Sequence, residues 1–215
     1  MTTCACYLAA PIASFRSPWA REYFETLPVP PPSTIYGLLL SAVGEPNRLV
    51  HQGTELAIGL LSQPTRARIF RTLWRIKDHH VPFGHGENKR PDFQELLIDV
   101  RLVVHVRTGS DPHQPPLADR IRRALEQPAS VERWGALAMG ESTHLVDEFR
   151  FLHTAEAQLP ARWLVPDDRG PFALPLWADH VGSKGTQFVQ CRLDQGQADS
   201  PPQFAWIRIT SNQTD

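Results

Sequence analysis

The sequence predicts an α+β domain, and three features of its pattern support this. Segments typical of strands alternate with segments typical of helices over the first 150 residues. Hydrophobic residues make up 41% of the 215 residues, which is enough for a buried core. The chain has 20 prolines, which cluster at 28–32, 112–116, 160–175 and 201–202. Because proline ends helices and central strands, these clusters mark where elements end.

A strand followed by a helix opens the chain. Residues 4–15 are small, apolar and compatible with a β-strand. After a proline-rich loop, apolar residues recur at helical spacing. These are Ile35, Leu38, Leu39 and Ala42. We therefore expect a helix that Ser33 or Thr34 caps and that ends at Gly44.

Two further strands, a second helix and another strand are expected next. Residues 55–61 form a short apolar run, and residues 94–107 alternate between two kinds of side chain. One face of the second strand is apolar: Leu96, Ile98, Val100, Leu102, Val104 and Val106. The other carries Asp99, Arg101, His105 and Arg107 and is expected to be polar. A helix with Leu117, Ile121, Ala124 and Leu125 on one face follows, and then a strand at 145–152.

The order strand, helix, strand, strand, helix, strand is that of the ferredoxin-like (RRM-like) βαββαβ unit. This unit is common among RNA-binding modules, although many unrelated functions use it. We assign residues 1–154 to it, with a basic insertion at about 64–95 that projects from the sheet. Residues 155–215 are expected to form a small, partly irregular appendage with short strands near 187–193 and 204–209.

Composition excludes several classes of protein. A net charge of −1 excludes a uniformly basic nucleic-acid binder. Three cysteines form neither a disulfide framework nor a four-ligand zinc site, so we expect a cytoplasmic protein without a metal. The sequence has no apolar run long enough to cross a membrane and no signal segment, so we expect no membrane partner. Walker, Rossmann and serine-hydrolase motifs are missing from the sequence, so no cofactor is expected.

Basic charge is nevertheless concentrated in one segment. Residues 66–107 hold nine Lys or Arg against five Asp or Glu, and residues 65–77 hold five basic residues and no acid. Arginine neutralises phosphates, and interleaved aromatic rings stack on unpaired bases. The segment therefore predicts RNA contacts through Arg66, Arg68, Arg71, Trp74, Arg75 and Lys77, and Arg101 follows on the polar face of its strand. The alternative is a solvated amphipathic segment whose Phe70 and Trp74 serve the core.

Glycines mark two other candidate contacts. Gly37 lies inside the expected helix, where glycine costs about 1 kcal/mol relative to alanine unless something approaches the backbone closely. Either a phosphate at the helix N-terminus or a tightly packed neighbouring strand would explain it. The loop at 139–143 offers backbone amides and hydroxyls to RNA, although turn chemistry alone would also account for its glycine.

Histidines in the insertion raise the question of catalysis. His79, His80 and His85 lie near Lys89 and Arg90, a set that is able to support metal-independent RNA cleavage. No evident carboxylate orients a histidine, so a loop that touches RNA without chemistry is the favoured interpretation.

The opening of the chain resembles a known family. Residues 10–16 (APIASFR) followed by residues 27–39 (LPVPPPSTIYGLL) are similar to the opening of the fifth family of CRISPR-associated proteins, within the RAMP (repeat-associated mysterious protein) superfamily. The resemblance continues through the basic insertion, which corresponds to the family's thumb, and through residues 137–142. It covers about the first 150 residues.

The resemblance implies a non-catalytic subunit of a type I Cascade complex that acts in antiviral defence. Such a subunit caps the 5′ handle of the guide RNA, contacts the backbone subunits through its thumb, and adjoins the large subunit that examines target DNA. The implied RNA contacts are Arg16, Ser33, Tyr36, Gly37, the thumb arginines, Gly140, Ser142 and Thr143. One branch of the family cleaves precursor RNA with tyrosine and an adjacent lysine and histidine. This chain has no Lys-His dipeptide, so a metal-independent endoribonuclease is the alternative.

Overall fold

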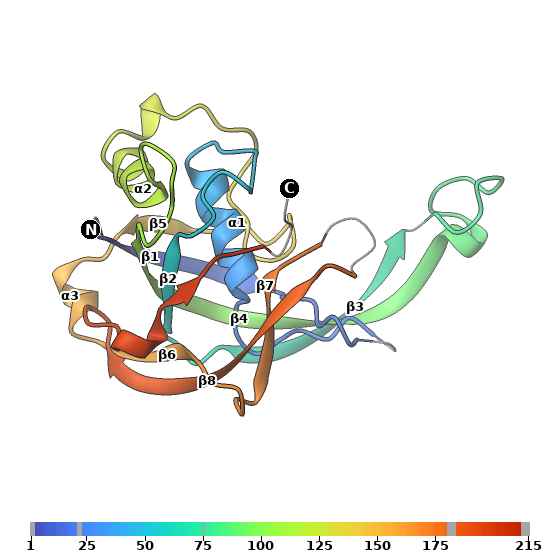
Figure 1. The fold of residues 1–215 in the computed structure, drawn as a ribbon. Helices are drawn as coiled ribbons and strands as arrows, with labels where there is room; N and C mark the ends of the chain where they lie inside the picture. The colour runs from blue at the N-terminus through green and yellow to red at the C-terminus, as the bar shows by residue number, and fades with distance from the viewer. Residues whose placement is uncertain (1–2, 21–22, 75, 180–183, 212–215) are drawn as a thin grey trace.

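A computed structural model describes residues 3–20, 23–74, 76–179 and 184–211. Strands pair into a nine-stranded sheet, in which the order along the main path is β5-β1-β4-β2-β6-β8-β7 (Figure 1). The strands are β1 (Thr3–Ala13), β2 (Glu55–Leu60), β3 (Thr65–Trp74), β4 (Lys89–Arg107), β5 (Glu148–Phe151), β6 (Pro160–Pro166), β7 (Phe172–Trp177), β8 (Gln187–Gln197) and β9 (Ile207–Arg208). The helices are α1 (Pro32–Ala42), α2 (Leu117–Glu126) and α3 (Thr154–Ala157), with short 3-10 turns at Gly86–Asn88, Pro128–Ser130 and Gln203–Ala205. The predicted α+β class is confirmed: the structure has a mostly antiparallel sheet and few helices. Within the described residues, no helix has the length and apolar character needed to cross a membrane.

The six elements expected in the first 154 residues are present near their expected positions. In chain order they are β1, α1, β2, β4, α2 and β5, and β4 pairs with both β1 and β2. The expected cap of α1 is wrong. The helix begins at Pro32, its N-cap is Pro31, and no side chain caps it. Proline at the first helical position replaces an amide that would have no partner, so Ser33 and Thr34 lie inside the helix.

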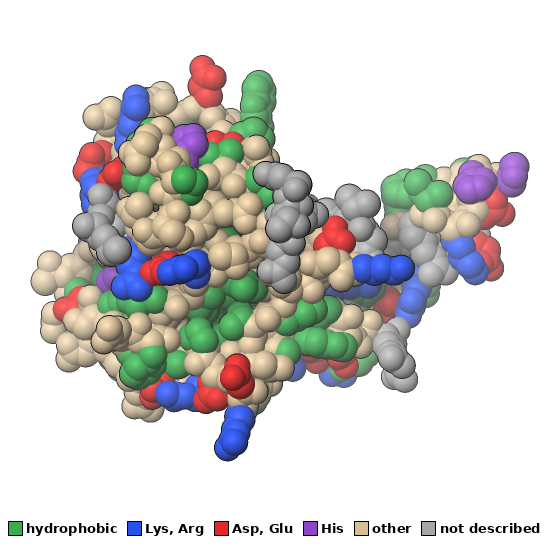
Figure 2. Space-filling view, in the orientation of Figure 1, with side chains coloured by type: hydrophobic (Ala, Val, Ile, Leu, Met, Phe, Trp, Pro, Cys, Tyr) green, Lys and Arg blue, Asp and Glu red, His purple; other side chains and the backbone are tan. Residues whose placement is uncertain are grey.

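The basic insertion is a β-hairpin that extends the sheet. β3 pairs with the first half of β4, from Thr65 opposite Ile98 to Trp74 opposite Lys89. We call β3, this half of β4 and the loop between them the hairpin arm. Figures 1 and 2 show that it stands out from the body of the protein, and that histidine lies at its tip. β4 therefore begins five residues before the predicted strand, because its cross-strand partner lies within the insertion.

A buried asparagine holds the tip of the hairpin arm. The side-chain oxygen of Asn88 accepts hydrogen bonds from the backbone N–H groups of Lys77 and Asp78 at 2.7 and 2.9 Å. Its amide nitrogen donates to the carbonyl oxygens of Asp78 and Val81. The loop is thus ordered around one side chain that satisfies four backbone groups.

The main core lies between the sheet and helices α1 and α2. Ile35 and Leu39 of α1 and Ile121 of α2 are buried against Leu102 and other apolar residues of β4. The helical spacing of these residues turns one stripe of each helix toward the sheet.

The other face of β4 is not simply polar, which corrects the sequence-based expectation. Val103 is buried in a second cluster with Ala57 and Trp163. His105 is also buried, and its Nε2 donates to the carbonyl oxygen of Ala198 at 2.8 Å. The strand's own alternation could not reveal this, because the covering residues come from the C-terminal segment.

That C-terminal segment is also more regular than predicted. Residues 155–215 contribute β6 to β9, and both β6 and β9 pair with β2 in the same sheet. The prolines lie where strands tolerate them. Pro160 and Pro166 are the end residues of β6, and Pro175 borders an irregularity in β7, the last strand of the path.

Candidate nucleic-acid interface

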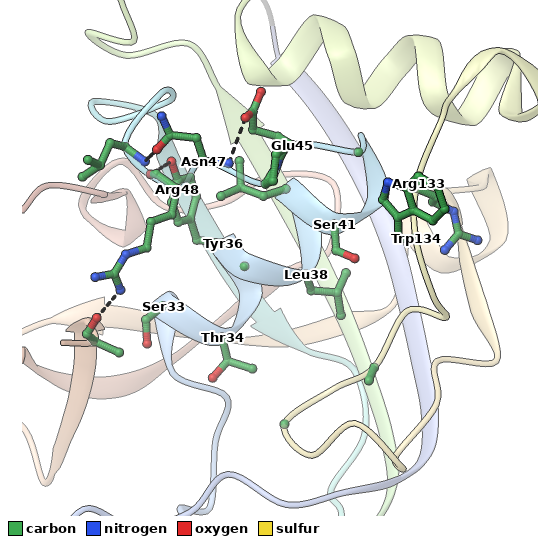
Figure 3. Close-up of a pocket in the computed structure, with 18 of the residues that line it drawn as sticks. Ser33, Thr34, Tyr36, Leu38, Ser41, Glu45, Asn47, Arg48, Arg133 and Trp134 are labelled. Atoms are coloured by element: carbon green, nitrogen blue, oxygen red, sulfur yellow. Dashed lines mark hydrogen bonds between the residues drawn. The ribbon is translucent and has the colours of Figure 1, made fainter. Parts of the chain in front are cut away.

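A groove of about 1000 Å³ runs beside α1 (Figure 3). One wall is the exposed side of α1, and the others come from residues 44–49, residues 133–140 and the end of β7. Four of the residues predicted to contact RNA line it: Ser33, Tyr36, Gly37 and Gly140. The sequence did not identify Arg48, Arg133, Trp134 and Trp177, which line it too. Each of these is isolated from any recognisable pattern in the sequence.

Gly37 faces open space in the groove. A Cβ built on this exposed residue would meet no described atom within 4 Å. The explanation by a tightly packed neighbouring strand is therefore wrong. The other explanation, an RNA phosphate that approaches Gly37 in the middle of α1, stays a prediction.

Gly140 is required by packing instead. Its φ is +93°, and a Cβ there would lie 2.0 Å from the carbonyl oxygen of Ser14. The backbone N–H of Met139 donates to the carbonyl oxygen of His144 at 2.8 Å and closes the loop, and Met139 is buried. Ser142 and Thr143 are exposed on the same loop. Arg16 lies two residues after Ser14, and its guanidinium carbon is 4.5 Å from the centre of the Phe24 ring. The loop thus rests on the end of β1 and presents its backbone to the groove.

A buried polar network holds the wall at residues 45–51. Nη1 of Arg120 donates to Oε2 of Glu45 at 2.6 Å and to Nε2 of His51 at 3.0 Å. Nδ1 of His51 donates to Asp111 at 2.8 Å, and both of these side chains are fully buried. Glu45 is therefore neutralised by an internal partner, and the wall's position depends on the network.

Arg48 extends from this wall across an aromatic ring. Its guanidinium carbon lies 4.8 Å from the centre of the Trp177 ring, and its Nη1 donates to the carbonyl oxygen of Ala178. The hydroxyl of Tyr36 donates to the carbonyl oxygen of Arg48 at 2.8 Å. Burial raises the pKa of Tyr36, so its phenol stays protonated. The guanidinium is thereby held at the groove with donors to spare for an anion.

The network predicts that stability falls in mild acid. Burial is the largest cause that lowers the pKa of His51, so the unfolded chain binds a proton near the ordinary histidine pKa of about 6.5 while the folded chain does not. In that interval the unfolded state binds more protons, and the free energy of unfolding decreases as pH falls below it. We expect the urea midpoint at pH 5.5 to lie below that at pH 7.5. His51→Gln, which keeps one donor and one acceptor without titrating, should reduce this difference. An unchanged pH dependence would contradict the assignment.

The described arginines of the hairpin arm are paired within the protein. Arg66 and Arg68 both contact Glu95, at 3.4 and 3.3 Å, and each remains about half exposed. Both carboxylate oxygens of Glu141 lie 3.1 Å from Nη2 of Arg71, so Arg71 ties the arm to the Gly140 loop. Lys77 pairs with Glu87. Arg75 lies outside the described residues.

Aromatic rings of the arm are exposed rather than buried in the core. Phe70 is 64% exposed and Trp74 is 62% exposed. The centre of the Phe70 ring lies 5.1 Å from that of Phe93 on the facing strand. The centre of the Trp74 ring lies 5.2 Å from that of Phe83 near the tip of the arm. The interpretation of Phe70 and Trp74 as core residues is therefore wrong.

Arg101 and the arm histidines are not brought into the groove. Arg101 pairs with Asp99 and lies on the sheet face opposite to that covered by α1. His79, His80 and His85 belong to the tip of the arm, whereas Tyr36 belongs to α1 on the body (Figure 1). Among the residues that the structure describes, no three His, Cys, Asp or Glu side chains are grouped to hold a metal ion.

Comparisons with known proteins agree on one family. The sequence model described as "CRISPR-associated protein (Cas_Cas5)" matches residues 5–135. The CRISPR-associated protein Cas5 of Myxococcus xanthus is 41% identical over 189 residues, which cover 87% of this chain and 88% of that protein.

Two solved structures share the fold. One, described as "CRISPR RNA-guided surveillance complex", has a TM-score of 0.62 at 17% identity and covers 91% of this chain and 90% of its own. The other, "Crystal structure of Cas protein", has a TM-score of 0.54 at 14% identity and covers 93% and 100%. The extent of the sequence matches and the predicted motifs lead to the same conclusion: this chain belongs to the Cas5 family of CRISPR-associated proteins.

Proposed function

We propose that this protein is the RNA-binding subunit of a type I CRISPR surveillance (Cascade) complex and caps the 5′ handle of the guide RNA. The observation that carries the proposal is the groove beside α1. It collects Ser33, Tyr36, Gly37 and Gly140, four of the residues that the family resemblance assigned to RNA. The fold's likeness to a chain from an RNA-guided surveillance complex supports the same role.

The architecture suits a module that joins subunits. β1, α1, β2, β4, α2 and β5, with β4 and β5 on either side of β1, are proposed to be the ferredoxin-like unit, and the hairpin arm is proposed to be the thumb. Exposed Phe70, Trp74 and Phe93 give the arm an apolar surface suited to a neighbouring backbone subunit. The body is then left to the RNA and to the large subunit that examines target DNA.

The groove offers the chemistry that a single RNA strand needs. Arg48 and Arg133 provide positive charge, and the acid beside them, Glu45, is already paired with Arg120. The open space at Gly37 allows a sugar-phosphate backbone to approach the middle of α1 closely. Arg16, Arg66 and Arg68 lie outside the groove's lining and are proposed to contact the RNA as it leaves.

We further propose that the protein binds this RNA without cleaving it. A tyrosine that acts as a base must lose its proton. Burial raises the pKa of Tyr36, and its hydroxyl already donates a hydrogen bond to the carbonyl oxygen of Arg48. The described side chains also place no carboxylate against His79, His80 or His85 to orient it.

Binding and cleavage of a repeat-derived RNA in EDTA test both statements. We expect the full chain to bind this RNA more tightly than a scrambled RNA and to leave it intact. Arg48→Ala combined with Arg133→Ala should lower the affinity and reduce the slope of log Kd against log salt by up to about 1.4, since each lost phosphate contact on a single strand contributes about 0.7. Fluorescence anisotropy at several salt concentrations measures both.

The matched control removes two exposed arginines that do not line the groove, Arg123 and Arg169. It should change neither the affinity nor the slope. Equal binding of repeat-derived and scrambled RNA would contradict the capping role, and specific cleavage in EDTA would establish the endoribonuclease alternative.

A further inference from the structure

Trp134 is the most exposed large hydrophobic side chain among the described residues. It is 96% exposed and lines the groove beside Arg133. In Figure 3 these two side chains lie together near Ser41, toward the C-terminal part of α1. A solvent-exposed indole is typical of a residue that binds a partner.

The backbone that carries Trp134 is fixed on both sides. Before it, the carbonyl oxygen of Glu132 lies so close to Gly44, at the end of α1, that a Cβ there would come within 2.0 Å of it. After it, Gly140 rests on Ser14 in the same manner. Between these two contacts, Nη1 of Arg133 donates to the carbonyl oxygen of Gly135 at 3.0 Å. The Trp134 side chain is thus exposed to solvent on a segment whose two ends lie against the body of the protein.

We infer that Trp134 is a stacking platform for one unpaired nucleobase, with the Arg133 guanidinium beside it for the adjoining phosphate. The inference rests on the proposed RNA binding in the groove and adds to it a subsite for a base. Single-stranded nucleic acid is bound by this combination of an aromatic plane and a cation.

The neighbours of Trp134 favour a base over a protein surface. Residues 132–136 are all exposed, and Trp134 is the only large apolar residue among them. The core of a protein interface requires several adjacent apolar residues that exclude water together. One isolated indole next to an arginine meets the requirements of a single base.

Anisotropy with the full chain and the repeat-derived RNA tests the subsite. Trp134→Ala and Trp134→Leu should each weaken binding by about 5- to 150-fold, whereas Trp134→Phe keeps most of the affinity. The salt slope should stay as in wild type, because no charge is removed. Thermal unfolding should be unchanged, because the side chain is exposed.

A set of RNAs that each lack one base locates the contact. In wild type, one abasic position should weaken binding, and in Trp134→Ala the same position should have no further effect. Equal affinities for wild type and all three variants would overturn the subsite while leaving the proposed function intact. If the variants bind RNA normally but lose co-purifying CRISPR subunits, Trp134 is a protein contact and the inference is wrong. If wild type shows no preference for repeat-derived RNA, the proposed function fails and the subsite with it.

Discussion

Gly37→Leu is expected to weaken binding of the guide RNA's 5′ handle by about 10- to 100-fold while leaving the protein folded. The Cβ of residue 37 points into open space, so a leucine side chain must enter the groove instead of the core. There it displaces an RNA backbone that lies against α1, and the phosphate and base contacts next to it are lost together.

Stability should change in the opposite direction. Leucine is a better helix former than glycine by about 0.5 to 1 kcal/mol in a helix interior, and no described neighbour has to move. Urea unfolding measures this gain, and anisotropy measures the loss of affinity. Gly37→Ala is the matched control: it brings most of the stability gain with far less bulk, so its effect on RNA binding should be clearly smaller. Wild-type affinity in Gly37→Leu would show that RNA does not use this part of the groove.

Gly140→Ala is expected to lower the free energy of unfolding by about 2 to 4 kcal/mol. The left-handed backbone at residue 140 disfavours any side chain, and the added Cβ would lie 2.0 Å from the carbonyl oxygen of Ser14. The loop must then lift from the end of β1, and its buried Met139 must move with it. Urea unfolding by circular dichroism measures the effect.

Ser142→Ala on the same loop is the control. Ser142 is exposed, so its removal should change stability by less than about 0.5 kcal/mol. Wild-type stability in Gly140→Ala combined with a loss of RNA binding would mean that Gly140 acts by contacting RNA and not through packing.

The positions of Gly37 and Gly140 could be predicted as notable from the sequence, but the role of each glycine could not. Both were predicted as RNA contacts, but glycine in a sequence does not reveal whether its missing side chain makes room for the protein's own backbone or for a ligand. The placement of Ser14 against Gly140 assigns that glycine to packing, whereas no described atom lies against Gly37, so its contact with RNA stays a prediction.

The main elements were predictable where the pattern was local. The strand at 55–61 follows from a short apolar run and the helix that carries Ile121 from helical spacing, and the structure places β2 and α2 there. The second buried face of β4 was not predictable, because Trp163 reaches His105 and Val103 from a distant segment. The groove residues Arg48 and Trp177 were missed for the same reason: they meet only after β7 has folded against α1.

The position of the RNA within an assembled complex tests whether the groove beside α1 holds the 5′ handle. A guide RNA with 4-thiouridine in its 5′ handle would be incorporated into the surveillance complex, cross-linked by light and analysed by mass spectrometry. We expect cross-links to residues 33–49 and 133–140, two segments that line the groove, and their loss in Gly37→Leu. Cross-links confined to the strands β6 to β8, with none to either segment, would contradict it.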